Sequence, residues 1–370
     1  MIYINESSFF DAAGIGVYRK IMAQCRVFEK AFGTTYCTTR HGGIAYLIHQ
    51  DEVIEKKPTL SKMDFYVCAQ EWVLKYDQKQ VYIRYNLGNK WLIDFVSWLK
   101  EKDINSLVEI HTFDNINEFS DSGLKIEDRF YGYQLSEYYD TCVGYDDRDS
   151  YRGMKVIPQV NGVDMYRNPL SKTADCTDKY KDSCVMTVVG NLGKWGGYER
   201  VIRGVNEYYE NGGKRNLEFN IIGSGEEYYF YKSLIETLKV CAYVHLIGPV
   251  RSQKVLNDYY DKTDIAVGMM GAYKGCAHLE KGSNIKMREY CARGIPIIYG
   301  YNDVGFSGDE EYLLRFPNND SVIDINEVIA LHDRVMLNRN AIAKKMRRYI
   351  GENYTWDLIL KPVIAYFREN

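Results

Sequence analysis

The chain has 370 residues, of which 46% are hydrophobic and 26% charged, so it is long enough for two folded domains and too apolar for a disordered protein. A formal net charge of −3, with no basic stretch interleaved with aromatic residues, excludes nucleic acid as an expected partner. The nine cysteines are scattered and form no Cys-x-x-Cys pair, which favours reduced thiols over a disulfide framework or a zinc site.

The chain shows no sign of a membrane-spanning or secretory segment. No stretch approaches 18 uninterrupted apolar residues, and Met1–Asn5 lacks the basic start and apolar run of a signal peptide. We therefore expect a cytoplasmic protein, and peripheral contact with the inner face of a membrane stays open.

The first half of the chain alternates short apolar segments with helical periodicity. Ile2–Ile4 is a predicted strand, and the loop after it ends in Gly14-Ile15-Gly16 and leads into a helix that reaches about Phe32. A strand, a glycine loop and a helix are the first unit of a doubly wound α/β sheet. Further parallel strands are predicted at residues 45–48, 65–69, 81–85 and 107–110.

A helix predicted from about Trp91 to Lys102 has its large apolar residues on one face. Such a face could lie on a bilayer. We favour packing against the sheet, because every crossover helix needs an apolar face.

The pattern lapses between Tyr166 and Cys184 into a polar segment without periodicity, where we expect the interdomain linker. A second α/β series follows. Its strands are predicted at residues 185–189, 219–222, 244–247, 265–268 and 296–299, with helices starting near 198, 226, 253 and 284. Helices are also predicted at residues 326–337, 341–349 and 356–367.

The segment Ser283–Ile298 carries the most specific chemistry. A loop containing Gly282 runs into a helix start, whose free backbone N–H groups suit a diphosphate. Glu289 in this helix could accept both hydroxyl groups of a ribose. In the alternative interpretation the segment is one more α/β unit with Glu289 on its surface.

The segment Glu289–Ile298 also resembles the Glu-x-x-Ala-x-Gly-x-Pro-hydrophobic segment of retaining glycosyltransferases with the GT-B fold. The resemblance is to the family 4-like group that includes bacterial capsule and exopolysaccharide enzymes, and it covers nearly the whole chain as an ordered set of short motifs. The other motifs are Gly14-Ile15-Gly16 with Gln24, Tyr82-Ile83-Arg84-Tyr85, Val108-Glu109-Ile110-His111-Thr112, Asn161-Gly162-Val163-Asp164, Val189-Gly190-Asn191-Leu192 with Lys194 and Gly197, Ile222-Gly223-Ser224-Gly225, and Leu246-Ile247-Gly248.

This resemblance implies two Rossmann-like doubly wound α/β domains that face each other across a cleft. They would comprise residues 1–168 and 178–354, joined by a hinge near Lys172, and a C-terminal helix at 355–370 would cross back onto the first domain. The buried face of that helix would consist of Trp356, Leu358, Ile359 and Val363.

The resemblance also implies the reaction, which is hexosyl transfer with retention of configuration and without an obligatory metal or cofactor. The donor would be a nucleotide sugar, with UDP preferred to GDP, and the acceptor a glycan, preferably lipid-linked. The donor-binding residues would be Gly14, Gly16, Asn191, Gly223, Gly225, Gly282, Ser283, Asn284, Ile285, Lys286 and Glu289. Arg84, Glu109 and Thr112 would lie on the acceptor side, and His111, Lys194 and Glu280 would act in catalysis.

Two of these roles have a structural alternative. Lys194 could stabilise the leaving diphosphate or be a solvated loop lysine. His111 could orient the donor sugar or cap a buried strand end. Arg288 is a further candidate for the diphosphate.

The chain departs from the family pattern at two places. The family's first Glu falls in register with Lys281, one residue after Glu280. Its usual Arg and Lys after the first strand of the second domain align with Asn191 and Gly196.

These departures keep two other functions open. The chain could be a non-catalytic GT-B subunit that supports an active enzyme. A sugar-nucleotide 2-epimerase is less favoured, because such enzymes place several carboxylates and histidines in the cleft. The acidic run Asp146-Asp147-Arg148-Asp149 fits a solvated loop better than a metal site.

Overall fold

The computed structural model describes residues 1–11, 14–113, 121–145, 148–172, 182–274 and 281–370. It divides the chain into unit 1, Met1–Val160 with Trp356–Asn370, and unit 2, Asn161–Thr355. The boundary precedes the polar segment that follows Tyr166, because hydrogen bonds already hold Asn161 and Val163 within unit 2. Most of the expected linker, residues 173–181, lies outside the described residues.

Unit 1 is built on a nine-stranded sheet in the order β4-β3-β2-β1-β5-β6-β7-β9-β8. Strands β1, β2, β5, β6, β7 and β9 pair in parallel, whereas β3, β4 and β8 join in antiparallel pairs. The strands are β1 Ile2–Ile4, β2 Tyr36–His41, β3 Ile44–His49, β4 Glu52–Pro58, β5 Gln80–Tyr85, β6 Asn105–Ile110, β7 Thr141–Gly144, β8 Ser150–Tyr151 and β9 Met154–Pro158.

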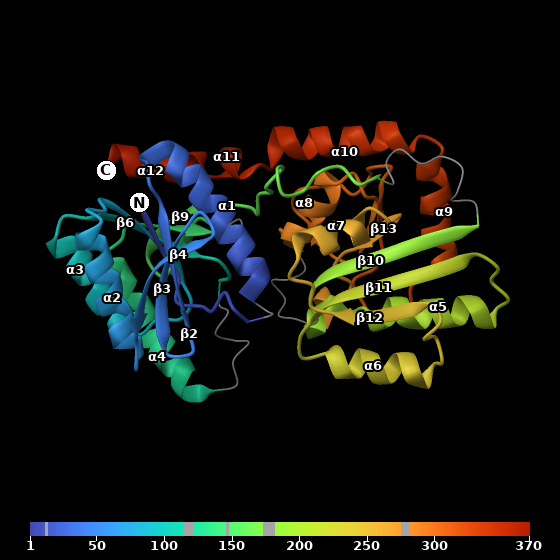
Figure 1. The fold of residues 1–370 in the computed structure, drawn as a ribbon, viewed down its shortest axis with the longest axis horizontal. Coiled ribbons are helices and arrows are strands. Elements are labelled where there is room, and N and C mark those ends of the chain that lie inside the picture. Colours follow the sequence, from blue (N-terminus) through green and yellow to red (C-terminus); the bar gives the residue numbers. More distant parts are fainter. Residues whose placement is uncertain (12–13, 114–120, 146–147, 173–181, 275–280) are drawn as a thin grey trace. The chain divides into compact units, whose positions relative to one another are not determined.

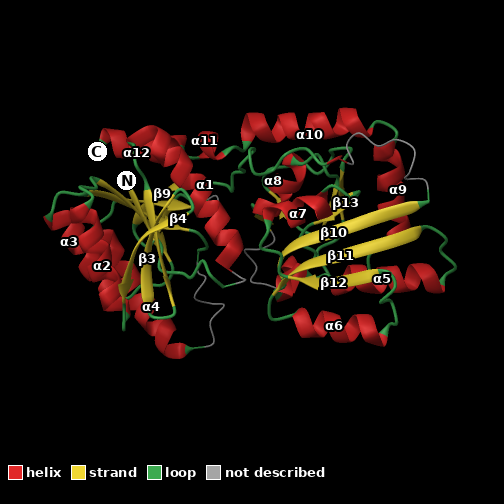
Figure 2. Cartoon of the chain, in the orientation of Figure 1, coloured by secondary structure: helices red, strands yellow, loops and turns green. Residues whose placement is uncertain are grey.

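Helices cover both faces of this sheet. Helices α2, α3 and α4 lie on one side, and α1 lies on the other with the C-terminal helices α11 and α12 (Figures 1 and 2). Their bounds are α1 Gly14–Phe32, α2 Lys62–Lys75, α3 Lys90–Glu101, α4 Ser122–Gln134, α11 Trp356–Ile359 and α12 Lys361–Glu369.

The strand predicted at residues 65–69 is wrong, because these residues belong to α2. A run of five apolar residues fits a strand or a buried helix equally well. A capping box decides for the helix: Ser61 Oγ accepts from the backbone N–H of Asp64 at 3.2 Å, and the Asp64 carboxylate accepts from the N–H of Ser61 at 2.9 Å.

Helix α3 packs against the sheet, as expected, and not as a free apolar face. Leu92, Phe95, Val96 and Leu99 are buried in unit 1. No helix in the described part of the chain is long and apolar enough to span a membrane.

Unit 2 contains a six-stranded sheet, entirely parallel, in the order β12-β11-β10-β13-β15-β17. These strands are β10 Ser183–Asn191, β11 Asn216–Ser224, β12 Val244–Gly248, β13 Ile265–Val267, β15 Ile297–Tyr299 and β17 Leu313–Arg315, and a separate parallel pair is formed by β14 Lys281–Gly282 and β16 Asn302–Asp303.

Helices lie on both sides of this second sheet (Figure 1). Their bounds are α5 Glu199–Glu210, α6 Tyr228–Thr237, α7 Gln253–Tyr260, α8 Ile285–Ala292, α9 Ile325–Met336 and α10 Arg339–Asn353. The first strand of the unit, β10, is central, with the next two strands on one side and the later three on the other. The strand order therefore reverses between β10 and β13. Doubly wound sheets bind ligands at such a point, at the carboxyl ends of their strands.

The last fifteen residues belong to unit 1. The segment expected as one helix is two, α11 and α12. Trp356, Val363 and Phe367 are buried, whereas Leu358 and Ile359 are only half-buried. The ring of Phe367 lies edge-on to the rings of Phe32 in α1 and Tyr82 in β5, with ring centroids 5.9 Å and 6.4 Å apart.

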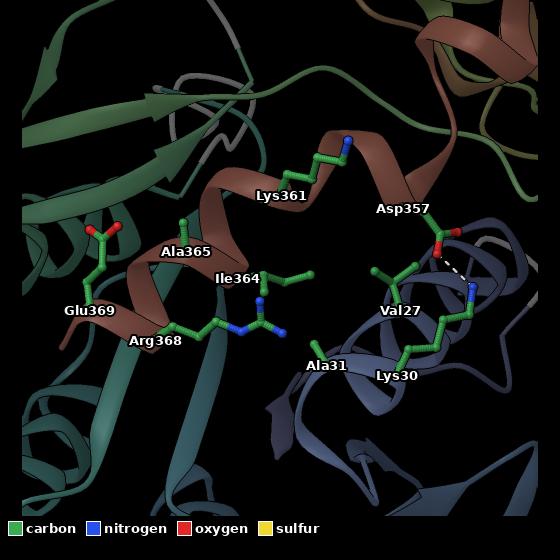
Figure 3. Close-up of a pocket in the computed structure, with 9 residues that line it drawn as sticks. All are labelled: Val27, Lys30, Ala31, Asp357, Lys361, Ile364, Ala365, Arg368 and Glu369. Carbon is green, nitrogen blue, oxygen red and sulfur yellow. Dashed lines mark hydrogen bonds and ion pairs between the residues drawn. The ribbon is translucent and has the colours of Figure 1, made fainter.

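A groove of about 450 Å³ separates α1 from α12 (Figure 3). An ion pair between Lys30 and Asp357, 2.6 Å long, closes one end. The groove contains none of the residues predicted to bind donor or acceptor.

We predict that Phe367→Ala lowers the free energy of unfolding of unit 1 by about 3–5 kcal/mol, because it removes a buried ring that contacts two aromatic neighbours. Arg368→Ala, at the exposed next position, is the control and should change stability by less than about 0.5 kcal/mol. Urea unfolding would measure both. Equal midpoints for the two variants would show that α12 does not fasten to unit 1.

Candidate functional site

Two loops meet at the carboxyl edge of the unit 2 sheet, where the strand order reverses. The loop after β10 and the loop after β13 are joined by hydrogen bonds from Met270 N to Gly196 O at 2.8 Å and from Gly271 N to Trp195 O at 3.0 Å. Gly197 has φ +63°, and a Cβ there would lie 2.4 Å from Gly271 N. Only glycine permits this approach. The two joined loops therefore form a rigid rim at the place where the strand order reverses.

Lys194 lies on this rim, in the 3-10 turn Lys194–Gly196. Its backbone N–H donates to the Glu226 carboxylate at 3.3 Å, while its exposed ammonium has no partner among the described residues. A fixed backbone with a free cationic side chain can bind an anion at the strand ends.

The neighbouring glycines have a structural reason of their own. A Cβ on Gly223 would lie 1.9 Å from Gly190 O, and one on Gly225 would lie 2.5 Å from Asn191 Oδ1. Leu192 N also donates to Ser224 O at 2.9 Å, which ties the ends of β10 and β11 together. These glycines therefore allow two strand ends to touch, and their presence alone does not indicate a ligand.

Side chains cap the start of α8. Asn284 is the N-cap and accepts from Lys286 N at 2.9 Å. The Ser283 hydroxyl accepts from Asn161 N at 2.8 Å, and the Ser283 carbonyl accepts from Asn161 Nδ2 at 2.5 Å. The predicted loop of Gly282, Ser283, Asn284 and Ile285 is thus a capped helix start, in which the N–H groups of Asn284 and Lys286 donate to Asp303 and to the Asn284 side chain.

Arg288 is not available to a diphosphate. Its side chain and that of Asp303 are fully buried and form an ion pair at 2.5 Å. Asp303 also accepts from Asn284 N at 3.3 Å, from Gly305 N at 2.9 Å and from the hydroxyl of Tyr301. Arg288 therefore anchors the start of α8 and is a structural residue.

Glu289 lies one turn into α8 and is half-buried. Its carboxylate accepts from Lys286 Nζ at 2.6 Å, and the two side chains are 14% and 18% exposed. The next residue, Tyr290, fixes the helix to the sheet because its hydroxyl accepts from Val189 N at 3.0 Å. The carboxylate is held in place and reachable, and a ribose would compete with Lys286 for it.

In unit 1 a buried polar network lies at the ends of β5 and β6, with Glu109 at its centre. The carboxylate accepts from Tyr3 Oη at 2.8 Å, Lys20 Nζ at 3.2 Å, Arg84 Nη1 at 3.1 Å and Gln24 Nε2 at 3.4 Å. Its side chain is 0% exposed.

Charge controls the titration of this network. Burial alone would raise the pKa of Glu109, but Lys20 and Arg84 lower it to about 2. Burial lowers the pKa of Lys20 to about 8, although Glu109 opposes this shift. Glu109 thus positions two cations and is not itself free to contact an acceptor.

His111 follows β6, beside this network. Burial and the cations of Arg84 and Lys20 lower its pKa well below the usual range, so the imidazole is neutral. Its Nδ1 atom is inaccessible and has no hydrogen-bond partner among the described residues. Thr112, the next residue, is half-buried.

The predicted residues are divided between the two units. Unit 2 holds Asn191, Lys194, Gly223, Gly225, Gly282, Ser283, Asn284, Ile285, Lys286 and Glu289. Unit 1 holds Gly14, Gly16, Arg84, Glu109, His111 and Thr112. Gly14 begins α1, where a Cβ would lie 2.0 Å from Ser8 O, and Gly16 faces open space.

Some predictions fall outside the described residues, and two residues were missed. Glu280 and the pair Asp146-Asp147 are not among the residues described. Sequence reasoning missed Lys20 and Asp303. A lone lysine on the apolar face of a predicted helix was the available signal for Lys20, whereas nothing in the sequence pairs Asp303 with Arg288.

Metal binding finds no support within the described ranges, where no three His, Cys, Asp or Glu residues are grouped so as to hold an ion. The described cysteines are free thiols: Cys25, Cys37, Cys68, Cys142, Cys184, Cys241 and Cys291.

No family model matches this chain, and no curated protein matches it in sequence. Similar solved structures do exist. Sucrose-phosphate synthase from Thermosynechococcus elongatus matches over 100% of this chain and 98% of its own, with a TM-score of 0.66 and 13% identity. A glycosyltransferase from Rickettsia africae matches over 100% and 97%, with a TM-score of 0.65 and 12% identity.

The Anabaena protein HepE, solved in complex with UDP and glucose, matches over 100% of this chain and 99% of its own, with a TM-score of 0.64 and 11% identity. Likeness at this level of identity shows the fold alone. Both units are Rossmann-like, and the chain has the GT-B fold of these glycosyltransferases.

Proposed function

We propose that this protein transfers a sugar from a nucleotide-sugar donor to a glycan acceptor, with the donor bound by unit 2. The observation that carries the proposal is the grouping of a capped helix start, a half-buried carboxylate and a free lysine within one doubly wound unit. The solved complex of HepE with UDP and glucose supports a uridine nucleotide as the first candidate.

Each element of the donor site has a chemical task. The backbone N–H groups at the start of α8 and the Lys194 ammonium would bind the diphosphate and stabilise it as the leaving group. Glu289 would accept the two ribose hydroxyls after releasing Lys286, which is then free to turn toward the phosphates. These interactions would stabilise the negative charge that develops on the diphosphate as the bond between sugar and phosphate breaks.

Retention of configuration would follow from the same arrangement. The leaving phosphate can take the acceptor proton on the face from which it departs, so no dedicated base is required. We propose unit 1 as the acceptor side, with His111 as a neutral hydrogen-bonding group and a lipid-linked glycan as the preferred acceptor.

Purified protein should hydrolyse its own donor slowly in the absence of acceptor, and complete inactivity against a sugar-nucleotide panel would favour a non-catalytic subunit.

We predict that Glu289→Gln weakens binding of the nucleoside diphosphate at least about a hundredfold. Each hydrogen bond to a charged group contributes about 1.5–3 kcal/mol, and about 1.4 kcal/mol corresponds to tenfold. The melting temperature without ligand should stay within a few degrees of wild type, because the side chain keeps its size. Glu207→Gln, on the exposed face of α5, is the control. Wild-type affinity in Glu289→Gln, measured by calorimetry, would place the donor site elsewhere.

We predict a different pattern for Lys194→Ala, since its proposed partner is the phosphate. Affinity for the nucleoside diphosphate should fall about tenfold to a hundredfold, while the bare nucleoside binds almost normally. Lys232→Ala, an exposed lysine of α6, should leave both affinities unchanged. Equal losses for nucleoside and diphosphate would show that Lys194 shapes the loop and does not touch phosphate.

We predict that Asp303→Asn impairs nucleotide binding indirectly. The change removes the charge opposite the fully buried Arg288, and leaving a buried charge unpaired costs about 3–5 kcal/mol. Both thermal stability and nucleotide affinity should fall, in contrast to Glu289→Gln, which should lower affinity alone. A stable Asp303→Asn protein with unchanged affinity would contradict the role of this pair in holding the start of α8.

A further inference from the structure

Among the described residues, the buried network of unit 1 contains more positive than negative charge. Lys20 and Arg84 are cations whose side chains are 10% and 7% exposed, and both approach Glu109, which is 0% exposed. His111 beside them is neutral. Glu109 accepts hydrogen bonds from both cations, but its single negative charge can offset only one of them.

The cations also have unused donors. A guanidinium has five N–H donors, and Arg84 uses one of them, toward Glu109. Its other N–H groups have no partner among the described residues, and the side chain is 7% exposed. Lys20 Nζ lies 3.8 Å from the centre of the Tyr145 ring, which leaves its position fixed.

The network lies where a parallel sheet binds ligands. Arg84 and Glu109 stand near the carboxyl ends of the adjacent strands β5 and β6, opposite each other in register, and His111 follows β6 directly. A nearly buried positive charge is costly unless an anion offsets it. Arginine N–H groups match the oxygen geometry of phosphate and carboxylate.

We propose that this network is an oxyanion site, and that it binds a phosphate or carboxylate group of the acceptor through Arg84 and Lys20. The inference rests on the proposed glycosyltransferase function and specifies its substrate class as an anionic acceptor. Glu109 is a positioning residue, because it holds both cations without touching the ligand.

The test measures binding of inorganic phosphate by thermal shift at constant ionic strength, with and without saturating UDP. Lys20→Met removes the surplus charge but leaves the Arg84–Glu109 pair, so the fold should survive and phosphate affinity should fall about tenfold or more. Lys90→Met, which removes an exposed ion pair with Asp94 at 2.9 Å and a cation–π contact with Trp91 outside this network, is the matched control and should bind phosphate like wild type.

Glu109→Gln should change phosphate affinity in the opposite direction to Lys20→Met. The variant should be less stable than wild type, yet it should bind phosphate several-fold more tightly, since the network then contains two cations and no anion. A purely structural network would lose stability in both variants without moving phosphate affinity, and that result would overturn the proposal. If Glu109→Gln does not fold, the phosphate affinity of Lys20→Met still tests the proposal.

Separate arms identify the anion and its location. Inorganic phosphate and glucuronic acid represent the two sources, and stabilisation by either that Lys20→Met weakens supports the site. Stabilisation by neither overturns it. Loss of the phosphate effect on adding UDP or in Lys194→Ala would place phosphate in unit 2 and also overturn it. UDP binding without phosphate binding rejects this inference alone, and phosphate binding without UDP binding rejects the donor proposal alone.

Discussion

The buried ion pair between Arg288 and Asp303 is the interaction on which the candidate donor site depends. It joins the first turn of α8 to the short strand β16, and Asp303 also binds the backbone of the cap residue Asn284. Because both side chains are fully buried, neither can leave without exposing the other as an unpaired charge. The helix start is therefore held in one position, and Glu289 is positioned by residues that would not contact the proposed nucleotide.

The sequence predicts five strands of the unit 2 sheet from their apolar segments and the helix signals between them, whereas β17 is not predicted. Gly294 shows the reason: at φ +67° it ends α8 just before the buried strand β15, and both features are visible in the sequence. Unit 1 is less predictable. The antiparallel strands β3 and β4 interrupt the alternation, so the strand predicted as parallel at residues 45–48 is antiparallel. The apolar run at residues 65–69 is a helix because of a cap four residues earlier.

The sequence indicates candidate site residues but not the partners of their side chains. Glu289 and Lys194 were indicated by their place in the motifs, yet the ion pair of Glu289 with Lys286 and the hydrogen bond of Lys194 N to Glu226 depend on loop geometry. Glycine motifs are the least specific signal, because Gly223 and Gly225 are required where two strand ends touch, with or without a ligand. A resemblance built on such glycines indicates the fold more strongly than the chemistry.

The two buried charge networks differ in balance, and this difference separates support from binding. Arg288 and Asp303 pair one cation with one anion, so their charges balance, although Arg288 Nε and Nη2 are buried without a hydrogen-bond partner among the described residues. Lys20 and Arg84 share the single carboxylate of Glu109, and the other N–H groups of Arg84 have no partner among the described residues. A fold gains no stability from a second cation that nothing neutralises. Its persistence at the strand ends is explained if a ligand supplies the missing negative charge.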